Sequence, residues 1–349
     1  MSNPIAMSAQ LATNMARFGW YYGVNRLVDR QARRLGQRPR YKARRPVPDT
    51  QELMGSLANL FLADAEAVRR GFYPAAEAEP GGASALVARV RDMLNDLPGA
   101  IARRESEEAD SARQAAAEHG LADYPDYYVQ DFHFQTGGYL TETSARLYDV
   151  QVETLFYGAA GAMRRAGFPA IAGAIRGRDQ RQLALLDIAC GTGRFLREVR
   201  LAWPALGLTG LDLSEPYLAE ARRHMSPLRP AKFIAGNAEA IPMPDQSQDI
   251  VSCVFLFHEL PPDIRRSVTN EIARVLKPGG ILVFIDSLQM GDRPSWDGIL
   301  EAFPVRFHEP YFRHYAIDDL DGMFREAGLG PVSTSLAFLS KVMVRRRMS

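Results

Sequence analysis

The sequence has few residues of the kinds that build covalent frameworks or strongly charged surfaces. Only two of its 349 residues are cysteines, Cys190 and Cys253, and both follow or lie within apolar runs. This argues against a disulfide framework or a zinc site and predicts two small buried thiols. The net charge is +1, from 42 basic and 41 acidic side chains. Such a balance argues against a protein that holds nucleic acid by overall charge.

Long apolar runs are also missing. Polar side chains interrupt residues 4–24, and no basic segment precedes a compact apolar one, so neither a membrane span nor a signal peptide is expected. These features predict a cytoplasmic protein. The segment from Arg33 to Arg45 is strongly cationic and is broken by Pro39. It indicates either a solvated connector or a peripheral contact with anionic lipid.

The length exceeds that of one α/β core and predicts a second folding unit. Helical periodicity is expected over residues 4–35, from Asp49 to Gly71, and from Leu86 until Pro98 ends it. Asp49 is expected to cap Glu52, whose side chain would reach back. We divide the chain into an N-terminal helical region with a basic linker (1–125), a lid with connecting helices (126–179) and a core (180–349).

One long helix is predicted from about Thr143 to Met163. Gly158 and Gly161 within it indicate close backbone packing against another element. Beyond this helix, apolar runs near 183–188, 207–212, 231–235, 248–255 and 281–286 alternate with helical segments. This alternation predicts an α/β fold with a doubly wound sheet.

A glycine turn follows the first of these strands. Asp187 ends the apolar run, Gly191 and Gly193 let the backbone approach a ligand, and Asp212 ends the next strand, where an acid can bind ribose hydroxyls. A dinucleotide-binding turn needs a third small residue where this chain has Leu196. An NAD-dependent reductase is disfavoured for that reason, and because no Tyr-x-x-x-Lys pair lies on a plausible helix.

These residues resemble motif I of the class I S-adenosylmethionine-dependent methyltransferases. The resemblance continues through Gly236–Pro242, which is similar to the segment bordering adenine, and through Arg274–Gly280, which is similar to the turn into the fifth strand. It covers residues 183–286 and is greatest to the ubiquinone and menaquinone C-methyltransferases. One departure is Asn237, where many relatives carry Asp.

The resemblance implies a Rossmann-like, doubly wound seven-stranded sheet with an antiparallel last strand, beside the N-terminal α-helical region. The runs 331–338 and 341–346 would form the closing hairpin. It also implies S-adenosyl-L-methionine as the cofactor. The residues it assigns to cofactor binding are Asp187, Ala189, Gly191, Gly193, Asp212, Leu213, Asn237 and Ala238.

Acceptor chemistry is expected where the fourth strand ends. His258 and Glu259 follow that strand, and ligands bind beyond the carboxyl ends of parallel strands. Either side chain is a candidate general base, although His258 can equally line the pocket or cap the next helix. No Asn/Asp-Pro-Pro-Tyr/Phe sequence follows, which disfavours amine methylation of DNA bases, and Pro262 excludes a zinc-protease helix.

Two aromatic segments are candidates for contacting the acceptor. The turn around Gly138 is expected to form part of a lid, with His133 and Tyr139 as its candidate residues. A second segment, after the fifth strand, is expected to be an aromatic loop, with His308 and Tyr311 orienting the acceptor and Arg313 pairing with an anionic group on it. Each of these side chains can instead be part of the core.

The sequence therefore predicts methyl transfer to a small organic acceptor, preferably aromatic or quinone-like. A small-molecule substrate is expected, without nucleic acid or a metal ion. The alternative is a catalytically silent nucleoside-binding scaffold that docks through its N-terminal region.

Overall fold

A computed structural model describes residues 3–37, 41–77, 81–106, 111–118, 124–226 and 228–349. Its centre is a seven-stranded sheet with the order β3-β2-β1-β4-β5-β7-β6. The strands are β1 (Ala184–Ile188), β2 (Gly207–Asp212), β3 (Lys232–Ala235), β4 (Gln248–Val254), β5 (Leu276–Ser287), β6 (Leu329–Ala337) and β7 (Ser340–Arg347). β1 to β5 pair in parallel, and β7 is antiparallel to both of its neighbours. The predicted fold class is confirmed.

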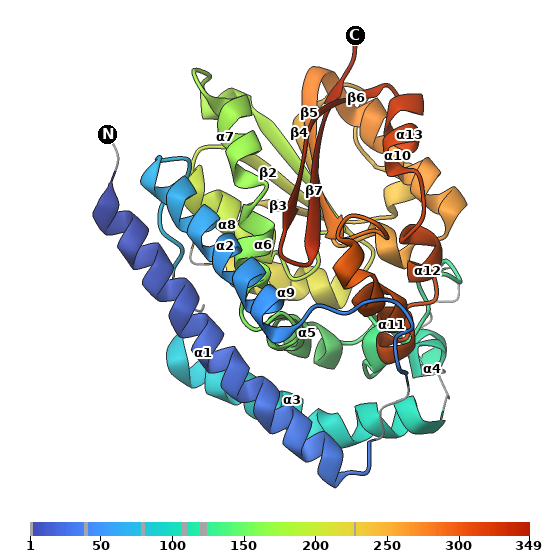
Figure 1. Ribbon diagram of the computed structural model, residues 1–349. Coiled ribbons are helices and arrows are strands. Elements are labelled where there is room, and N and C mark those ends of the chain that lie inside the picture. The colour runs from blue at the N-terminus through green and yellow to red at the C-terminus, as the bar shows by residue number, and fades with distance from the viewer. Residues whose placement is uncertain (1–2, 38–40, 78–80, 107–110, 119–123, 227) are drawn as a thin grey trace.

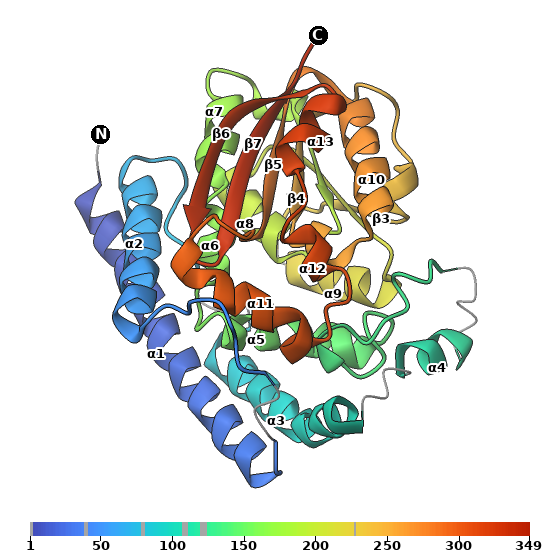
Figure 2. The same cartoon turned by 45° about the vertical axis from the view of Figure 1, so that its right-hand side comes forward.

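The central strands are apolar because helices cover both faces of the sheet. Leu185, Leu186 and Ile188 of β1 are completely buried, as are Ile250 and Val251 of the adjoining β4. In Figures 1 and 2, helices α7 and α8 lie on one face and α10 and α13 on the other.

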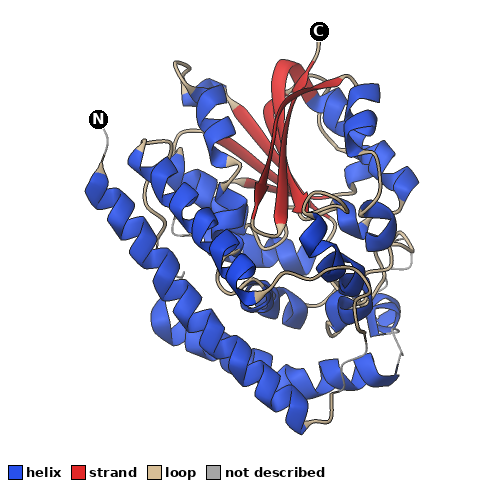
Figure 3. Ribbon diagram, in the orientation of Figure 1, coloured by secondary structure: helices blue, strands red, loops and turns tan. Residues whose placement is uncertain are grey.

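Helices make up most of the remaining chain (Figure 3). The α-helices are α1 (Pro4–Arg34), α2 (Thr50–Arg69), α3 (Gly82–Ser106), α4 (Ser111–Glu118), α5 (Glu142–Leu155), α6 (Ala160–Arg165), α7 (Phe168–Ile175), α8 (Arg194–Ala202), α9 (Glu215–Met225), α10 (Pro262–Val275), α11 (Asp297–Phe307), α12 (Phe312–Tyr315) and α13 (Leu320–Glu326). Short 3₁₀ turns are η1 (Phe132–Phe134), η2 (Gln180–Gln182), η3 (Ala238–Ala240), η4 (Phe257–Glu259) and η5 (Pro294–Trp296). The segment after β5, expected as a loop, is therefore largely helical. Among the described residues, no helix is both long and apolar enough to cross a bilayer.

Pro98 does not end α3, contrary to prediction. A proline inside a helix leaves the carbonyl four residues earlier without its usual N–H partner. Here that carbonyl belongs to Leu94, and the side-chain amide of Gln31 in α1 donates to it over 3.0 Å. The neighbouring helix therefore supplies the bond that the proline removes.

The predicted long helix from Thr143 is also wrong, because the chain turns between α5 and α6. Tyr157 and Gly158 both have positive φ there. A Cβ on Gly158 would lie 2.8 Å from the carbonyl oxygen of Arg17 in α1. The predicted close backbone approach is present, but it accompanies a break in the helix.

Residues 41–47 cross over α11. The backbone amides of Arg44 and Arg45 donate to Glu301, and Gly298 donates to the carbonyl of Pro46 over 2.7 Å. The cationic segment is thus partly a structural connection. Its residues 38–40 lie outside the described residues, and lipid contact by Arg33 to Arg45 stays a prediction.

A buried polar network joins α1 and α2 to α6. Asp64 of α2 accepts hydrogen bonds from Gln10, Asn14, Tyr73 and Arg165, the last through two nitrogens at 2.9 and 2.8 Å. Burial raises the pKa of Asp64, but the Arg165 charge and these bonds outweigh burial and lower it.

A second link joins α2 to the segment after β5. Asp49 caps the amide of Glu52, as predicted, but Glu52 does not reach back. Its carboxylate instead accepts from the indole N–H of Trp296 and the hydroxyl of Ser295, both over 2.6 Å.

Candidate functional site

A pocket opens where β1, β2 and β4 end. Asp212 holds the glycine turn there, because its two carboxylate oxygens accept from the backbone N–H groups of Gly191 and Ser214, each over 2.8 Å. Ala189, Gly191, Asp212 and Leu213 line this pocket, which we name the strand-end pocket.

Two acidic side chains lie at this end of the sheet, Asp187 buried and Asp212 partly buried. Burial raises the pKa of Asp212 to about 6, although N–H groups of Ser214 and Gly191 act against the shift. Burial likewise raises the pKa of Asp187 to about 7, against a 2.7 Å hydrogen bond from Ser252. Asp212 lines the strand-end pocket, whereas Asp187 lies inside the sheet against β4.

The two glycines of the turn have different surroundings. Gly191 has a φ of 53°, and a Cβ there would have only Tyr217, at 4.0 Å, within reach. A Cβ on Gly193 would lie 2.9 Å from the Cβ of Ala221. Gly191 therefore keeps the pocket side open, while Gly193 allows α8 and α9 to pack closely.

Asn237 and Ala238 border the pocket beyond β3. The Asn237 side chain caps η3 by accepting from the amide of Glu239 over 2.9 Å. Tyr127 also lines this side, and its hydroxyl donates to Glu239 over 2.6 Å.

Aromatic side chains cover the strand-end pocket. Tyr139 stacks on Phe132 with ring centroids 5.4 Å apart and meets Tyr217 edge to face. The Ser214 hydroxyl, directly after the Asp212 strand, donates to the carbonyl of Tyr139 over 2.6 Å. The expected lid segment therefore contacts the ligand-binding turn directly.

His258 and Glu259 lie on η4, and of the two only Glu259 lines the strand-end pocket. The imidazole of His258 bonds through Nδ1 to Asp286 of β5. Burial lowers the pKa of His258, but Asp286, Glu259 and Glu309 together raise it to about 10. An imidazolium with this pKa is a poor proton acceptor at neutral pH. Glu259 lines the pocket, and a role as general base stays a prediction for both residues.

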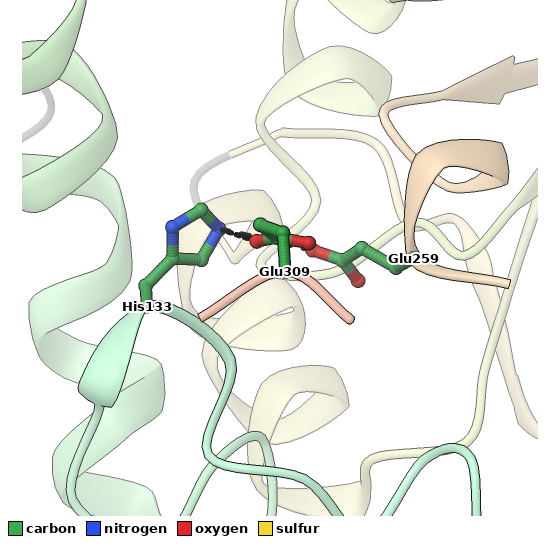
Figure 4. Close-up of side chains that lie close together, drawn as sticks. All are labelled: His133, Glu259 and Glu309. Carbon is green, nitrogen blue, oxygen red and sulfur yellow. Dashed lines mark ion pairs between the residues drawn. The ribbon is translucent and has the colours of Figure 1, made fainter. Parts of the chain in front are cut away.

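His133 and Glu309 lie close to Glu259, as Figure 4 shows. The Nε2 atom of His133 is 3.1 Å from a carboxylate oxygen of Glu309 and 3.8 Å from Oε1 of Glu259. The hydroxyl of Tyr139 donates to the same Glu259 oxygen. His133 also lines a second cavity, of about 640 Å³, between α1, α3 and α5, which we name the helical cavity.

The three candidate acceptor-binding residues after β5 lie in different surroundings. His308 packs on Phe134 with centroids 5.5 Å apart, and burial lowers its pKa. Tyr311 packs beside Phe132 and Tyr139, while Arg313 is exposed and lines neither cavity. Acceptor contacts by these three residues stay predictions.

Several pocket residues were not singled out from the sequence. They are Tyr127, Tyr128, Phe132, Tyr148 and Tyr217, which line the pocket, and Glu309. The aromatic content of residues 124–148 was a usable signal, whereas nothing in the pattern around Glu309 distinguishes it from a surface acid.

Comparisons with known proteins agree with this geometry. The methyltransferase domain family matches residues 185–280. The chain is 34% identical over 165 residues to a ubiquinone/menaquinone biosynthesis C-methyltransferase of Methylobacterium nodulans, covering 46% of this chain and 63% of that protein. It is 38% identical over 127 residues to a demethylmenaquinone methyltransferase of Thermotoga maritima, covering 36% and 53%. The chain thus spans less than two thirds of these relatives.

A solved structure of an S-adenosylmethionine-dependent methyltransferase from Methanosarcina mazei matches with a TM-score of 0.42. It is 20% identical and covers 52% of this chain and 97% of its own. The matched segment includes Asp187 and much of the strand-end pocket, with Gly191 and Asp212, whereas the aromatic side chains of residues 127–148 that line the pocket lie outside it. Over residues 185–280, the chain thus matches the methyltransferase domain family.

Proposed function

We propose that this protein transfers a methyl group from S-adenosylmethionine to a small organic acceptor that is aromatic or quinone-like. The observation that carries the proposal is the contact between two cavities. Glu259 lines the strand-end pocket, His133 lines the helical cavity, and the two side chains are 3.8 Å apart. A donor in the first and an acceptor in the second would meet at this point.

The strand-end pocket suits the donor nucleoside. Asp212 is a partly buried carboxylate whose hydrogen bonds come from backbone N–H groups, and it can accept bonds from ribose hydroxyls. Gly191 leaves room beside the backbone for the methionine part. The sulfonium supplies the methyl group, so these residues only bind and orient the donor.

We assign the exclusion of water from the strand-end pocket to the aromatic side chains that cover it. Tyr139, Phe132 and Tyr217 are each at least nine-tenths buried over the pocket. A closed apolar surround favours displacement at the methyl carbon over reaction with water.

The helical cavity suits a partly apolar acceptor. Its walls include Val28, Met93, Leu97 and Val152, with polar groups such as Gln151 among them. The quinone-like class is further supported by the names of the two relatives, a ubiquinone/menaquinone biosynthesis C-methyltransferase and a demethylmenaquinone methyltransferase.

Calorimetry with S-adenosylmethionine and with NAD tests the donor. We expect binding of the former alone, and Asp212→Ala should weaken it by about 3 kcal/mol, roughly 100-fold, because two bonds to a charged group are lost. Asp245→Asn, an exposed acid paired with Arg274, is the matched control and should bind as wild type. Binding of NAD without S-adenosylmethionine would overturn the proposal.

Metabolites of a deletion strain test the acceptor. Loss of a species heavier by one methylene than an accumulating one would identify the acceptor class. Full complementation of that strain by Asp212→Ala would instead support the catalytically silent scaffold.

A further inference from the structure

We propose that His133, Glu259 and Glu309 bind a divalent first-row transition-metal ion. The three side chains come from η1, η4 and the segment between α11 and α12, and they point toward one another (Figure 4). One ligand atom from each lies within 4.8 Å of the other two. The site is not assigned by the methyltransferase family match or by the relatives.

The distances suit coordination. Two ligand atoms that are each roughly 2.0–2.2 Å from one ion lie about 3 to 4 Å apart. His133 Nε2 is 3.1 Å from Glu309 and 3.8 Å from Glu259, within that range. One imidazole and two carboxylates are a donor set that Mn²⁺, Fe²⁺, Co²⁺ and Zn²⁺ accept.

The surroundings of Glu309 provide a second observation, independent of the distances between the ligand atoms. Its side chain is fully buried, and neither carboxylate oxygen has a hydrogen-bond partner. Buried carboxylates are normally paired or coordinate metals, and an ion held between Glu309 and Glu259 would supply the missing partner.

Residues around the three ligands are arranged to orient them. Tyr139 donates its hydroxyl to Glu259, and the Nε2 atom of His258, whose Nδ1 bonds to Asp286, is 3.8 Å from the same carboxylate oxygen. Metal ligands commonly have such outer hydrogen-bonding partners. Phe303 and Phe307 contact the His133 ring, with ring centroids 6.3 and 6.1 Å from it.

The position of the site suggests its use. Glu259 faces the strand-end pocket and His133 faces the helical cavity, so an ion held by both would lie between them. An acceptor with an oxygen ligand to that ion would be fixed beside the methyl donor. This last step rests on the proposed function, whereas metal binding does not.

Co²⁺ titration of the EDTA-dialysed full chain, followed by visible absorption, tests the proposal. We expect one equivalent to bind and Glu309→Gln to lower the affinity by more than about tenfold, the loss seen even for outer partners. Glu198→Gln is the matched control, because Glu198 is partly buried and also has a buried oxygen without a hydrogen-bond partner, but it pairs with Arg165. It should bind as wild type.

Absence of stoichiometric Co²⁺ binding, or equal binding by Glu309→Gln, would overturn the site. Circular dichroism establishes that Glu309→Gln is folded. Without metal, this variant should unfold at a temperature no lower than that of wild type, since a buried carboxylate is removed. If it fails to fold, His133→Asn, at a partly exposed position, decides by the same criterion. S-adenosylmethionine calorimetry in EDTA tests the methyl donor separately, so failure of either proposal is recognised on its own.

Discussion

The hydroxyl of Tyr139 donates to the carboxylate of Glu259, a residue 120 positions away in the chain. This bond connects the segment that covers the strand-end pocket to the turn after β4. A hydrogen bond to a charged group contributes about 1.5–3 kcal/mol. The cover is therefore held closed from inside the pocket.

Replacing that hydroxyl should loosen the cover. In Tyr139→Phe, we expect hydrogen exchange in residues 132–141 to accelerate by roughly 10-fold or more, because local opening loses about 1.5 kcal/mol or more. Tyr148→Phe is the control, since it removes a hydroxyl from the same aromatic cluster without touching this bond. Unchanged exchange in Tyr139→Phe would show that packing alone holds the segment.

Binding of S-adenosylmethionine should weaken as the pH falls from about 7 to 5. The pKa of about 6 for Asp212, which lines the pocket, means that this carboxyl group takes up a proton over this range. The ionised form is the better acceptor of ribose hydrogens, so binding must release that proton. Each pH unit below the pKa lowers the affinity for S-adenosylmethionine by up to about tenfold.

Calorimetry at several pH values, in two buffers of different ionisation enthalpy, measures this proton release. Asp212→Asn should release fewer protons than wild type. Proton uptake on binding, or an affinity that stays constant across the range, would contradict the assignment of Asp212.

Asp64→Asn should destabilise the whole fold by about 3–5 kcal/mol, because Arg165 keeps its charge while losing its buried partner. Urea unfolding measures the loss. Because the folded-state pKa of Asp64 is lowered, its contribution is present above its unfolded pKa and is lost as the pH falls through the folded value. The variant should thus lose less stability on acidification than wild type.

Glu66→Gln is a suitable control for Asp64→Asn. Glu66 lies on the same helix and pairs with Arg69, but it is exposed to solvent. Its replacement should leave the urea midpoint close to that of wild type. Equal effects of the two substitutions would show that the buried network does not anchor α1 and α2.

Gln31 and Pro98 should be energetically coupled. Gln31→Ala leaves the Leu94 carbonyl without a donor and should cost about 1–3 kcal/mol. In a Pro98→Ala background the restored N–H takes over that carbonyl, so the same substitution should cost less. A double-mutant cycle measured by urea unfolding gives the coupling, and additive effects would remove the explanation for the uninterrupted helix.

These examples show which features the sequence predicts and which it leaves open. The strands β1 and β4 were predictable because burial on both faces makes them continuously apolar. Asp212 was predictable because it ends the next strand at the usual spacing after the glycine turn. Pro98 was misread because its missing bond is supplied by a residue 67 positions earlier. Three segments without regular periodicity bring together His133, Glu259 and Glu309. Local sequence patterns do not show that segments so far apart in the chain are in contact.

The bond from Trp296 to Glu52 limits how this protein can be divided. Trp296 is completely buried, and one of its partners comes from the first quarter of the chain. A fragment starting at residue 180 would uncover this indole and leave its N–H without an acceptor. We expect such a fragment to aggregate on expression. Residues 180–349 would therefore need the preceding helices to stay in solution.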